Sequence, residues 1–285
     1  MLTALTLPVH ALRLKRRLLS LESPKVMGIV NLTPDSFFGG SRAASVSAAV
    51  ERARQMAAEG ADFLDLGAMS TRPGAEEVSV EEELDRLLPA LAAIREALPE
   101  MPLSVDTFRA EVARQALDAG ADIINDVTGG EDAAMYATVA AAGAPYILMH
   151  MRGNPRTMSG LTDYGDLFLD IQGYLLERVA AARAAGVGDI VLDPGLGFAK
   201  TTEQNFTLLR ELERFQVLEL PVLVGLSRKG MIWKTLGIRP EEALNGTTAL
   251  HMAALAGGAS ILRVHDVAEA RQVIRLWAHL RGERD

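Results

Sequence analysis

Polar and charged residues stand at the ends of eight short apolar runs in this sequence. They are Asn31, Asp65, Asp106, Asn125, Asp126, His150, Asp193, Ser227, Arg263 and His265. Burying carboxylates and amides is costly unless something hydrogen-bonds to them, and a polar heterocyclic ligand would supply that partner. Any one of these residues would also suit a turn or a helix cap, but their recurrence at eight successive run ends indicates one shared site.

Two long segments, residues 31–41 and 69–75, add features that suit a charged ligand. Both are punctuated by glycine and proline, and the first holds two adjacent phenylalanines that a solvated loop would not need. Arg72, Arg263 and His265 are donors able to converge on phosphate oxygens, and the planar fork of arginine suits this task better than lysine. The sequence therefore predicts a phosphate-type anion as part of the ligand.

Lysine is scarce in this chain, and two of its five lysines, Lys200 and Lys229, follow the sixth and seventh apolar runs. Lys229 could pair with Asp193 or donate to a ligand carbonyl, and a catalytic Schiff base is the competing hypothesis. No Walker A loop, G-x-S-x-G elbow or H-E-x-x-H motif occurs, and the glycine pairs present are weak signals for a dinucleotide. Hydride transfer is therefore disfavoured.

The apolar runs themselves predict the scaffold. They are too short for core helices and cover residues 26–32, 63–68, 103–106, 123–127, 146–150, 190–193, 222–226 and 261–265. Their starts lie about 34 residues apart, which leaves room for a strand, a helix and two loops, and stretches of helical spacing lie between them. Eight such units predict an α/β fold, a (β/α)8 TIM barrel, with its active site at the carboxyl ends of the strands.

Domain organisation and composition narrow the function further. No linker divides the chain, so we expect a single barrel domain over residues 26–285, and a short hairpin or helix in the N-terminal extension, residues 1–25, covering the barrel bottom. The net charge of −8 argues against nucleic acid, and the absence of cysteine removes disulfides and thiolate metal sites. No apolar run approaches about 18 residues, so we expect a cytoplasmic protein without a membrane partner.

Seven segments, in order along the chain, resemble the motifs of the dihydropteroate synthase family. They are residues 27–37 (MGIVNLTPDSF), 70–74 (STRPG), 104–107 (SVDT), 124–126 (IND), 193–198 (DPGLGF), 225–229 (GLSRK) and 263–266 (RVHD). The resemblance extends from about residue 26 to residue 280. The departures from the family pattern are small, with Leu196 standing where many members have phenylalanine.

The resemblance implies that para-aminobenzoate displaces pyrophosphate from 6-hydroxymethyl-7,8-dihydropterin pyrophosphate, giving 7,8-dihydropteroate in folate biosynthesis. The pterin would contact Asp106, Asn125, Met149, Asp193, Gly197, Phe198 and Lys229. The pyrophosphate would contact Asn31, Thr71, Arg72, Arg263 and His265, with Mg²⁺ held partly through Asn31. Para-aminobenzoate, or a sulfonamide resembling it, would lie among Phe37, Pro73, Ser227 and Arg228. The implied catalytic residues are Asp106, Asp193, Lys229, Arg263 and His265.

This chemistry asks for positioning and electrostatics more than for a strong base. An aromatic amine is neutral at pH 7, and pyrophosphate leaves the methylene carbon with cationic character that Asp106 and Asp193 could stabilise. The family commonly dimerises, so we expect a homodimer and place its contact at residues 249–256 and 267–280.

Two other functions stay open at this point. A related barrel transfers a methyl group from a methyl-tetrahydropterin to a corrinoid protein; it shares the pterin-facing Asp and Asn but needs no pyrophosphate donors. A non-enzymatic pterin-binding paralogue would keep the pocket and lose the catalytic residues. The Ser-Arg-Lys segment and the Asp-Ser-Phe of residues 35–37 favour the synthase.

Overall fold

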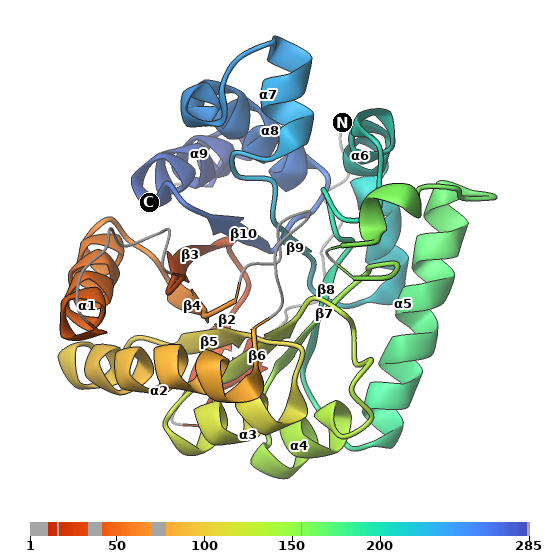
Figure 1. Cartoon of the computed structure of the whole chain (residues 1–285). Helices are drawn as coiled ribbons and strands as arrows, with labels where there is room; N and C mark the ends of the chain where they lie inside the picture. The colour runs from red at the N-terminus through yellow and green to blue at the C-terminus, as the bar shows by residue number, and fades with distance from the viewer. Residues whose placement is uncertain (1–10, 16, 34–41, 70–77, 155, 284–285) are drawn as a thin grey trace.

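The chain folds into a ring of parallel strands surrounded by helices (Figure 1). This computed structural model describes residues 11–15, 17–33, 42–69, 78–154 and 156–283. The strands of the ring are β3 (Lys25–Asn31), β4 (Phe63–Gly67), β5 (Leu103–Asp106), β6 (Ile123–Asp126), β7 (Tyr146–Met149), β8 (Ile190–Asp193), β9 (Leu223–Val224) and β10 (Ile261–Val264). All eight coincide with the predicted apolar runs to within a few residues.

Helices lie between consecutive strands and cover the outside of the ring. They are α1 (Arg42–Ala58), α2 (Val80–Ala97), α3 (Ala110–Asp118), α4 (Met135–Ala142), α5 (Leu167–Ala184), α6 (Thr202–Arg210), α7 (Gly230–Leu236), α8 (Leu244–Ala256) and α9 (Val267–Leu280). We expected one helix after each strand, but two follow β9. The first ends because Gly237 adopts a φ of 65°, and a short 3₁₀ turn, Pro240–Glu242, separates it from the second.

The ring closes through strand pairs of unequal length. β10 pairs in parallel with β3, from Ile261 opposite Lys25 to Val264 opposite Gly28, so the last strand joins the first. Between β8 and β9, the described residues form one isolated bridge, from Leu192 to Val222. This arrangement confirms the predicted (β/α)8 barrel, whose closure the periodicity of the sequence could not by itself establish.

The core lies between the strands and the helices. Every residue of β4 to β8 is buried, as expected for strands covered on both faces. Among the described residues, no helix is long and apolar enough to span a lipid bilayer.

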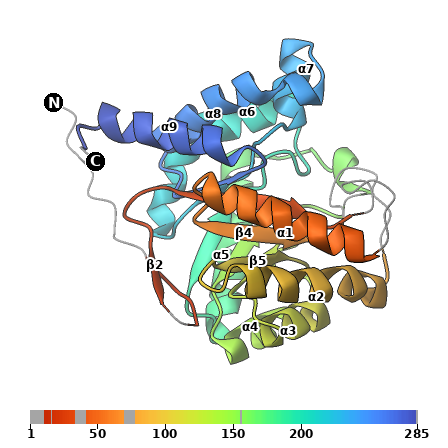
Figure 2. The same cartoon turned by 90° about the vertical axis from the view of Figure 1, so that its left-hand side faces the viewer.

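An antiparallel hairpin precedes the barrel and closes its amino-terminal end (Figure 2). It consists of β1 (Ala11–Arg13) and β2 (Leu18–Ser20). Alternation of side chains along β1 buries Leu12 between two exposed neighbours. Leu12, Leu14 and Leu21 pack on side chains from the strands of the ring, which are Met27, Phe63, Ile123, Ile147, Val191, Leu223 and Ile261. Of the two forms that we expected for this extension, the structure therefore contains the hairpin.

Candidate active site

The carboxyl ends of the strands bring the predicted polar residues to one mouth of the barrel. Asp106 and Asp193 end β5 and β8, Asn125 is the third residue of β6, and Arg263 lies in β10. The exposed fractions of Asp106, Asn125 and Asp193 are 9%, 3% and 6%. These side chains are therefore largely removed from water, where charge interactions are strong.

Arg263 holds two carboxylates from neighbouring strands. Its Nε donates to Oδ2 of Asp65 and its Nη2 to Oδ2 of Asp106, both at 2.7 Å. The side-chain amide of Asn125 donates to the same Asp65 oxygen at 3.0 Å. The other oxygen of Asp65, Oδ1, is buried without a hydrogen-bond partner in the described part of the chain. A buried acceptor of this kind can take an N–H from a ligand.

Burial sets the charge states of this cluster. It raises the pKa of Asp106 to about 7, although the charge of Arg263 acts in the opposite direction. Burial alone would lower the pKa of Arg263, but Asp65 and Asp106 outweigh it and hold that pKa above the ordinary value. Near neutral pH the guanidinium is charged, whereas Asp106 exchanges between carboxylate and carboxylic acid. Asp106 can thus accept from a heterocycle or donate to it.

Lys229 and Asp193 place a second pair of ionisable groups at the mouth. Nζ of Lys229 donates to the carbonyl oxygen of Leu196 and lies 4.5 Å from the centre of the Phe198 ring. Burial lowers the pKa of Lys229 to about 8, against the effect of Asp193, and burial raises the pKa of Asp193. Gly197 has a φ of 85°, and a Cβ there would lie 2.9 Å from Cδ of Lys229. Glycine therefore makes room for the lysine.

Apolar side chains cluster at the same end of the barrel. Met149, the last residue of β7, is 2% exposed and packs with Val127, Met151, Met158 and Ala199. Phe108 and Phe198 are partly buried against this group. Methionine and aromatic surfaces suit the flat face of a ring, so the mouth combines an apolar platform with buried polar groups.

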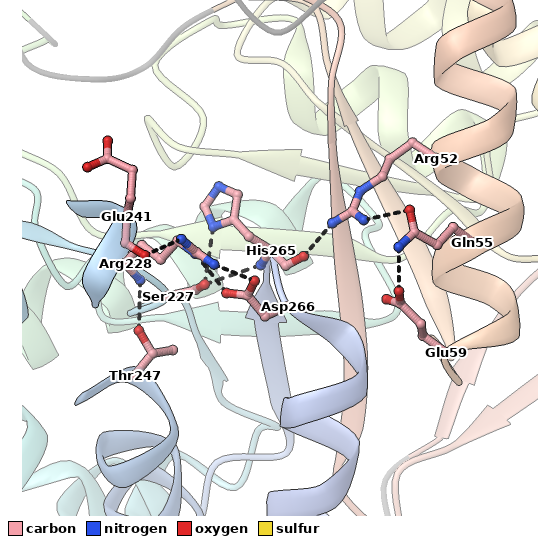
Figure 3. A network of polar contacts seen from close by, with 9 residues as sticks. All are labelled: Arg52, Gln55, Glu59, Ser227, Arg228, Glu241, Thr247, His265 and Asp266. Atoms are coloured by element: carbon pink, nitrogen blue, oxygen red, sulfur yellow. Dashed lines mark hydrogen bonds and ion pairs between the residues drawn. The ribbon is translucent and has the colours of Figure 1, made fainter. Parts of the chain in front are cut away.

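His265, which follows β10, is held by two other elements (Figure 3). Oγ of Ser227 lies 3.1 Å from Nδ1 of His265, and the main-chain N–H of His265 donates to the same hydroxyl at 3.2 Å. From α1, Arg52 donates to the carbonyl oxygen of His265 at 2.6 Å. A residue predicted for para-aminobenzoate, Ser227, thus contacts one predicted for pyrophosphate.

Arg228 turns its guanidinium toward Asp266 (Figure 3). Nε and Nη2 of Arg228 donate to the two carboxylate oxygens of Asp266 at 2.8 and 2.7 Å. Arg228 has a φ of 54°, and its main-chain N–H donates to Oγ1 of Thr247 at 3.1 Å. The pair joins the segment after β9 to the segment after β10 with the two-pronged geometry that arginine favours.

The remaining predicted site residues are four that lie outside the described part of the chain and Asn31. Phe37, Thr71, Arg72 and Pro73 lie outside the described residues. Asn31, the proposed magnesium ligand, ends β3 and is partly exposed. The described residues contain no group of three or more His, Asp or Glu that could hold a metal. An ion at Asn31 would therefore draw most of its oxygen ligands from a substrate and water, a common arrangement for Mg²⁺.

Sequence reasoning did not assign roles to three residues that the structure places at or beside the mouth. Asp65 was noticed only as a run end, and nothing in its spacing shows that Arg263 and Asn125 converge on it. Lys200 stood out only as a scarce lysine after the sixth apolar run, and the sequence did not indicate that its side chain is buried. Arg52 carried no signal, because it lies within an ordinary amphipathic stretch and 213 residues before its partner.

Comparisons with known proteins agree with this geometry. The model of a family described as pterin binding enzyme matches residues 27–265. A dihydropteroate synthase from Synechocystis sp. is 50% identical, over 88% of each chain. A crystal structure of Yersinia pestis dihydropteroate synthase with a sulfonamide drug has a TM-score of 0.90 at 38% identity, covering 96% of this chain and 100% of that one. The structure of a Xanthomonas albilineans dihydropteroate synthase with 4-aminobenzoic acid has a TM-score of 0.89 at 42% identity, and the match covers 96% of this chain and 99% of that one. The chain belongs to the dihydropteroate synthase family of pterin-binding enzymes.

Proposed function

We propose that this chain is a transferase that joins para-aminobenzoate to the pterinylmethyl group of 6-hydroxymethyl-7,8-dihydropterin pyrophosphate. The observation that carries the proposal is a cluster in one barrel mouth of a chain from this family, in which Asp106, Asn125 and Asp193 are buried and Lys229 and Arg263 are partly exposed. The related Xanthomonas albilineans protein was solved with 4-aminobenzoic acid, which supports the second substrate.

The pterin is assigned to the buried cluster. The amino-pyrimidine edge of a pterin offers donors and acceptors in a row, which Asp106, Asn125 and Asp193 can pair. Lys229, charged and already beside a carbonyl, would face the ring carbonyl, and Met149 and Phe198 would pack on the ring faces. Oδ1 of Asp65, which has no hydrogen-bond partner among the described residues, would add a further acceptor.

The pyrophosphate is assigned to the outer part of the mouth. His265 and Arg263 would donate to its oxygens together with Asn31, Thr71 and Arg72. Mg²⁺, held by Asn31 and by phosphate oxygens, would neutralise part of the charge that develops on the leaving group. The position of Asn31 at the end of β3, with one hard oxygen ligand to offer, supports this assignment.

The reaction is a substitution at the exocyclic methylene carbon. The bond from this carbon to the pyrophosphate oxygen breaks, and its electron pair leaves with pyrophosphate. The amine nitrogen of para-aminobenzoate forms the new bond and releases one proton to water or to the leaving group. Buried carboxylates beside the ring favour positive charge in the transition state, which is the role we assign to Asp106 and Asp193.

Para-aminobenzoate is assigned to the segment after β9 and to Phe37 and Pro73. The guanidinium of Arg228 is engaged by Asp266 and the hydroxyl of Ser227 contacts His265, so a carboxylate bound here would replace one of these contacts. The Yersinia pestis structure contains a sulfonamide drug, and we propose that sulfonamides bind this chain in the same subsite.

A turnover assay tests the proposal directly. Purified protein is mixed with the dihydropterin pyrophosphate, para-aminobenzoate and Mg²⁺, and we expect dihydropteroate and pyrophosphate in equal amounts. Removing Mg²⁺ with EDTA should suppress turnover, and Mn²⁺ or Mg²⁺ should restore it. Pterin binding without product would favour the non-enzymatic paralogue, and methyl transfer from a methyl-tetrahydropterin would favour the methyltransferase. Both alternatives disagree with relatives named dihydropteroate synthase.

The oligomeric state and the location belong to the same proposal. A homodimer would use α8 and α9, and on α9 Leu276 and Leu280 are 61% and 73% exposed. Sedimentation velocity of the wild-type protein beside Leu276→Glu tests this contact, because a dimer through α9 should dissociate in the variant. A cytoplasmic location stays a prediction.

A further inference from the structure

Lys200 is a buried lysine to which the proposed reaction gives no role. Its ammonium group lies inside the turn that follows β8, residues 194–201. Nζ donates to the carbonyl oxygens of Gly195 at 2.9 Å and Phe198 at 3.0 Å, and it lies 3.0 Å from Nδ1 of His150. Lys200 is 9% exposed. An ammonium group has three N–H donors, and these three contacts account for all of them.

The turn around this ammonium has an unusual backbone. Gly195 and Gly197 have φ values of 71° and 85°, and Ala199, which carries a Cβ, has a φ of 49°. A Cβ at Gly195 would lie 2.0 Å from the carbonyl oxygen of His150, so the backbone of the turn packs directly against the residue that follows β7. Glycine adopts the left-handed region freely, whereas Ala199 needs support from its surroundings to stay there.

His150 is suited to accept from the lysine. Its burial lowers its pKa to about 2, with Lys200 and Arg152 acting in the same direction. The ring is therefore neutral, and a contact from Lys200 to Nδ1 places the ring proton on Nε2. The lysine supplies the charge, and the histidine supplies an acceptor that does not compete for the proton.

The turn that Lys200 holds is the one assigned to the pterin. Gly197 donates its N–H to Oδ1 of Asn205 at 2.6 Å, and the carbonyl oxygen of Leu196 accepts from Lys229. The Phe198 ring lies under the ammonium of Lys229. A shift of this turn would therefore move both Phe198 and the partner of Lys229.

We propose that Lys200 is a positioning residue of the pterin subsite, whose buried ammonium holds residues 195–198 in the conformation that receives the pterin ring. This inference rests on the proposed function, because it assigns the turn to the pterin. Lys200 itself does not touch the substrate; it acts through Gly197, Phe198 and Lys229.

The charge state of Lys200 makes the proposal testable by pH. Burial lowers the pKa of Lys200 to about 7, while Asp193 acts in the opposite direction and Lys229 and Arg152 act in the same direction. His150 is the remaining ionisable group in contact, and it stays neutral. As the pH rises through this range, Lys200 loses one of its three N–H donors, so pterin affinity should fall on the alkaline side.

The first experiment compares two lysine variants. Affinity for 6-hydroxymethyl-7,8-dihydropterin is measured by calorimetry for the wild type, Lys200→Met and Lys234→Met. Lys234 lies on the exposed surface of α7 and serves as the matched control. We expect a loss of at least about tenfold for Lys200→Met, corresponding to one lost charge-assisted hydrogen bond, and no change for Lys234→Met. The amide of Gly197 should also exchange its hydrogen faster in Lys200→Met.

A chemical rescue separates positioning from folding. The chain has no cysteine, so Lys200→Cys can be aminoethylated at this one position while unfolded and then refolded. The product carries an amine of lysine length that is more acidic than lysine. We expect it to recover the pterin affinity lost in unmodified Lys200→Cys, and to move the alkaline limb of binding to lower pH. A limb caused by Lys229 or by the pterin itself would not move.

The outcomes distinguish this inference from the proposed function. Wild-type protein that binds no pterin would overturn the proposed function. Wild-type binding with equal affinity in Lys200→Met, or a rescued protein as weak as unmodified Lys200→Cys, would overturn the role of Lys200 alone. If Lys200→Met does not fold, His150→Leu replaces it: reduced pterin affinity at an unchanged melting temperature supports the proposal, and unchanged affinity contradicts it.

Discussion

Arg263 joins two buried carboxylates, so its removal is expected to affect folding as well as binding. Arg263→Met would leave Asp65 and Asp106 without their cation, and breaking a buried pair in this way costs several kcal/mol. Since the arginine side chain is 20% exposed, we expect about 3 kcal/mol, at the low end of that range. Urea unfolding measures this loss, and calorimetry should show weaker binding of phosphate-free pterin too.

A second variant identifies the origin of the Arg263 effect. Asp65→Asn combined with Arg263→Met removes one of the two carboxylates that the loss of Arg263 leaves without an ion-pair partner. The double variant should therefore be more stable than Arg263→Met alone. If Arg263→Met is as stable as the wild type, the ion pairs do not support the mouth, and Arg263 acts on the pyrophosphate only.

Asp106 should give pterin binding an acidic limb. Because burial raises its pKa to about 7, the carboxylate gains a proton as the pH falls through neutrality and can no longer accept from two N–H donors of the pterin. Deprotonation of Lys200 acts in the opposite direction over the same pH range, so the effect of Asp106 is measured as the ratio of wild-type affinity to the affinity of Asp106→Asn for 6-hydroxymethyl-7,8-dihydropterin. This ratio should decrease between about pH 8 and pH 6, because Asp106→Asn keeps Lys200 and lacks the carboxylate. A ratio that is flat over this range would contradict the assignment.

At the residue scale, the sequence predicts which side chains gather at one mouth but not the contacts between them. The ends of the apolar runs place Asp106, Asn125 and Asp193 in the mouth, because a barrel brings every strand end to one side, and the roles of these residues toward a ligand stay a prediction. The sequence did not predict the contacts of Asp65 or the direction of the Arg228 side chain, because both depend on which side chains meet once the ring has closed. Arg228 was predicted beside para-aminobenzoate, and in the structure its guanidinium contacts a carboxylate of the chain itself, Asp266.

At the scale of elements, the Arg228–Asp266 pair connects two segments that carry site residues (Figure 3). The segment after β9 holds Ser227 and Lys229, and the end of β10 holds Arg263. A double-mutant cycle of Arg228→Met and Asp266→Asn should give a coupling energy of about 1–2 kcal/mol in urea unfolding, because the pair is two-pronged and partly buried. KM for para-aminobenzoate should rise in both single variants. Additive effects would show that the segments are independent.

His251 on α8 should make the protein sensitive to acid. It is 1% exposed, neither ring nitrogen has a hydrogen-bond partner among the described residues, and burial lowers its pKa to about 4. In the unfolded chain the pKa is about 6.5. The unfolded state therefore binds a proton more readily, and stability falls as the pH drops from about 6.5 toward 4.

Replacing this histidine tests the cause. His251→Leu removes the unsatisfied nitrogens, so its free energy of unfolding should exceed that of the wild type by about 1–2 kcal/mol at pH 7, and by more at pH 5. His279→Leu, at an exposed position near the end of α9, is the matched control for the histidine-to-leucine change itself. Burial also lowers the pKa of His150, so part of the slope should remain in His251→Leu, and a slope as steep as that of the wild type would contradict a contribution from His251.

At the scale of the whole molecule, the repeat predicted the barrel, and local sequence could not predict how evenly the ring closes. Eight strands at regular spacing specify a closed parallel sheet, and the structure contains them in that order. The short pairing of β8 with β9 follows Pro221, which has no N–H for a ladder and accepts from Leu192 through its carbonyl. One helix was expected after β9, although Gly237 and Pro240 interrupt that stretch and are signals of a break.

The hairpin at the amino-terminal end should support stability without affecting catalysis. The hairpin lies at the opposite end of the barrel from the mouth (Figure 2). Its Leu12 is 2% exposed and packs with side chains near the start of the barrel strands. Leu12→Ala leaves a cavity there, so it should lower the free energy of unfolding by about 2–5 kcal/mol. The ratio kcat/KM for both substrates should stay at the wild-type value wherever the variant is folded. Leu18→Ala on the same hairpin is the matched control, because Leu18 is 68% exposed and should tolerate the change. A fall in turnover at unchanged stability would mean that the two ends of the barrel are coupled. Each strand extends from the hairpin end of the barrel to the mouth, so the strands could transmit a displacement from one end to the other.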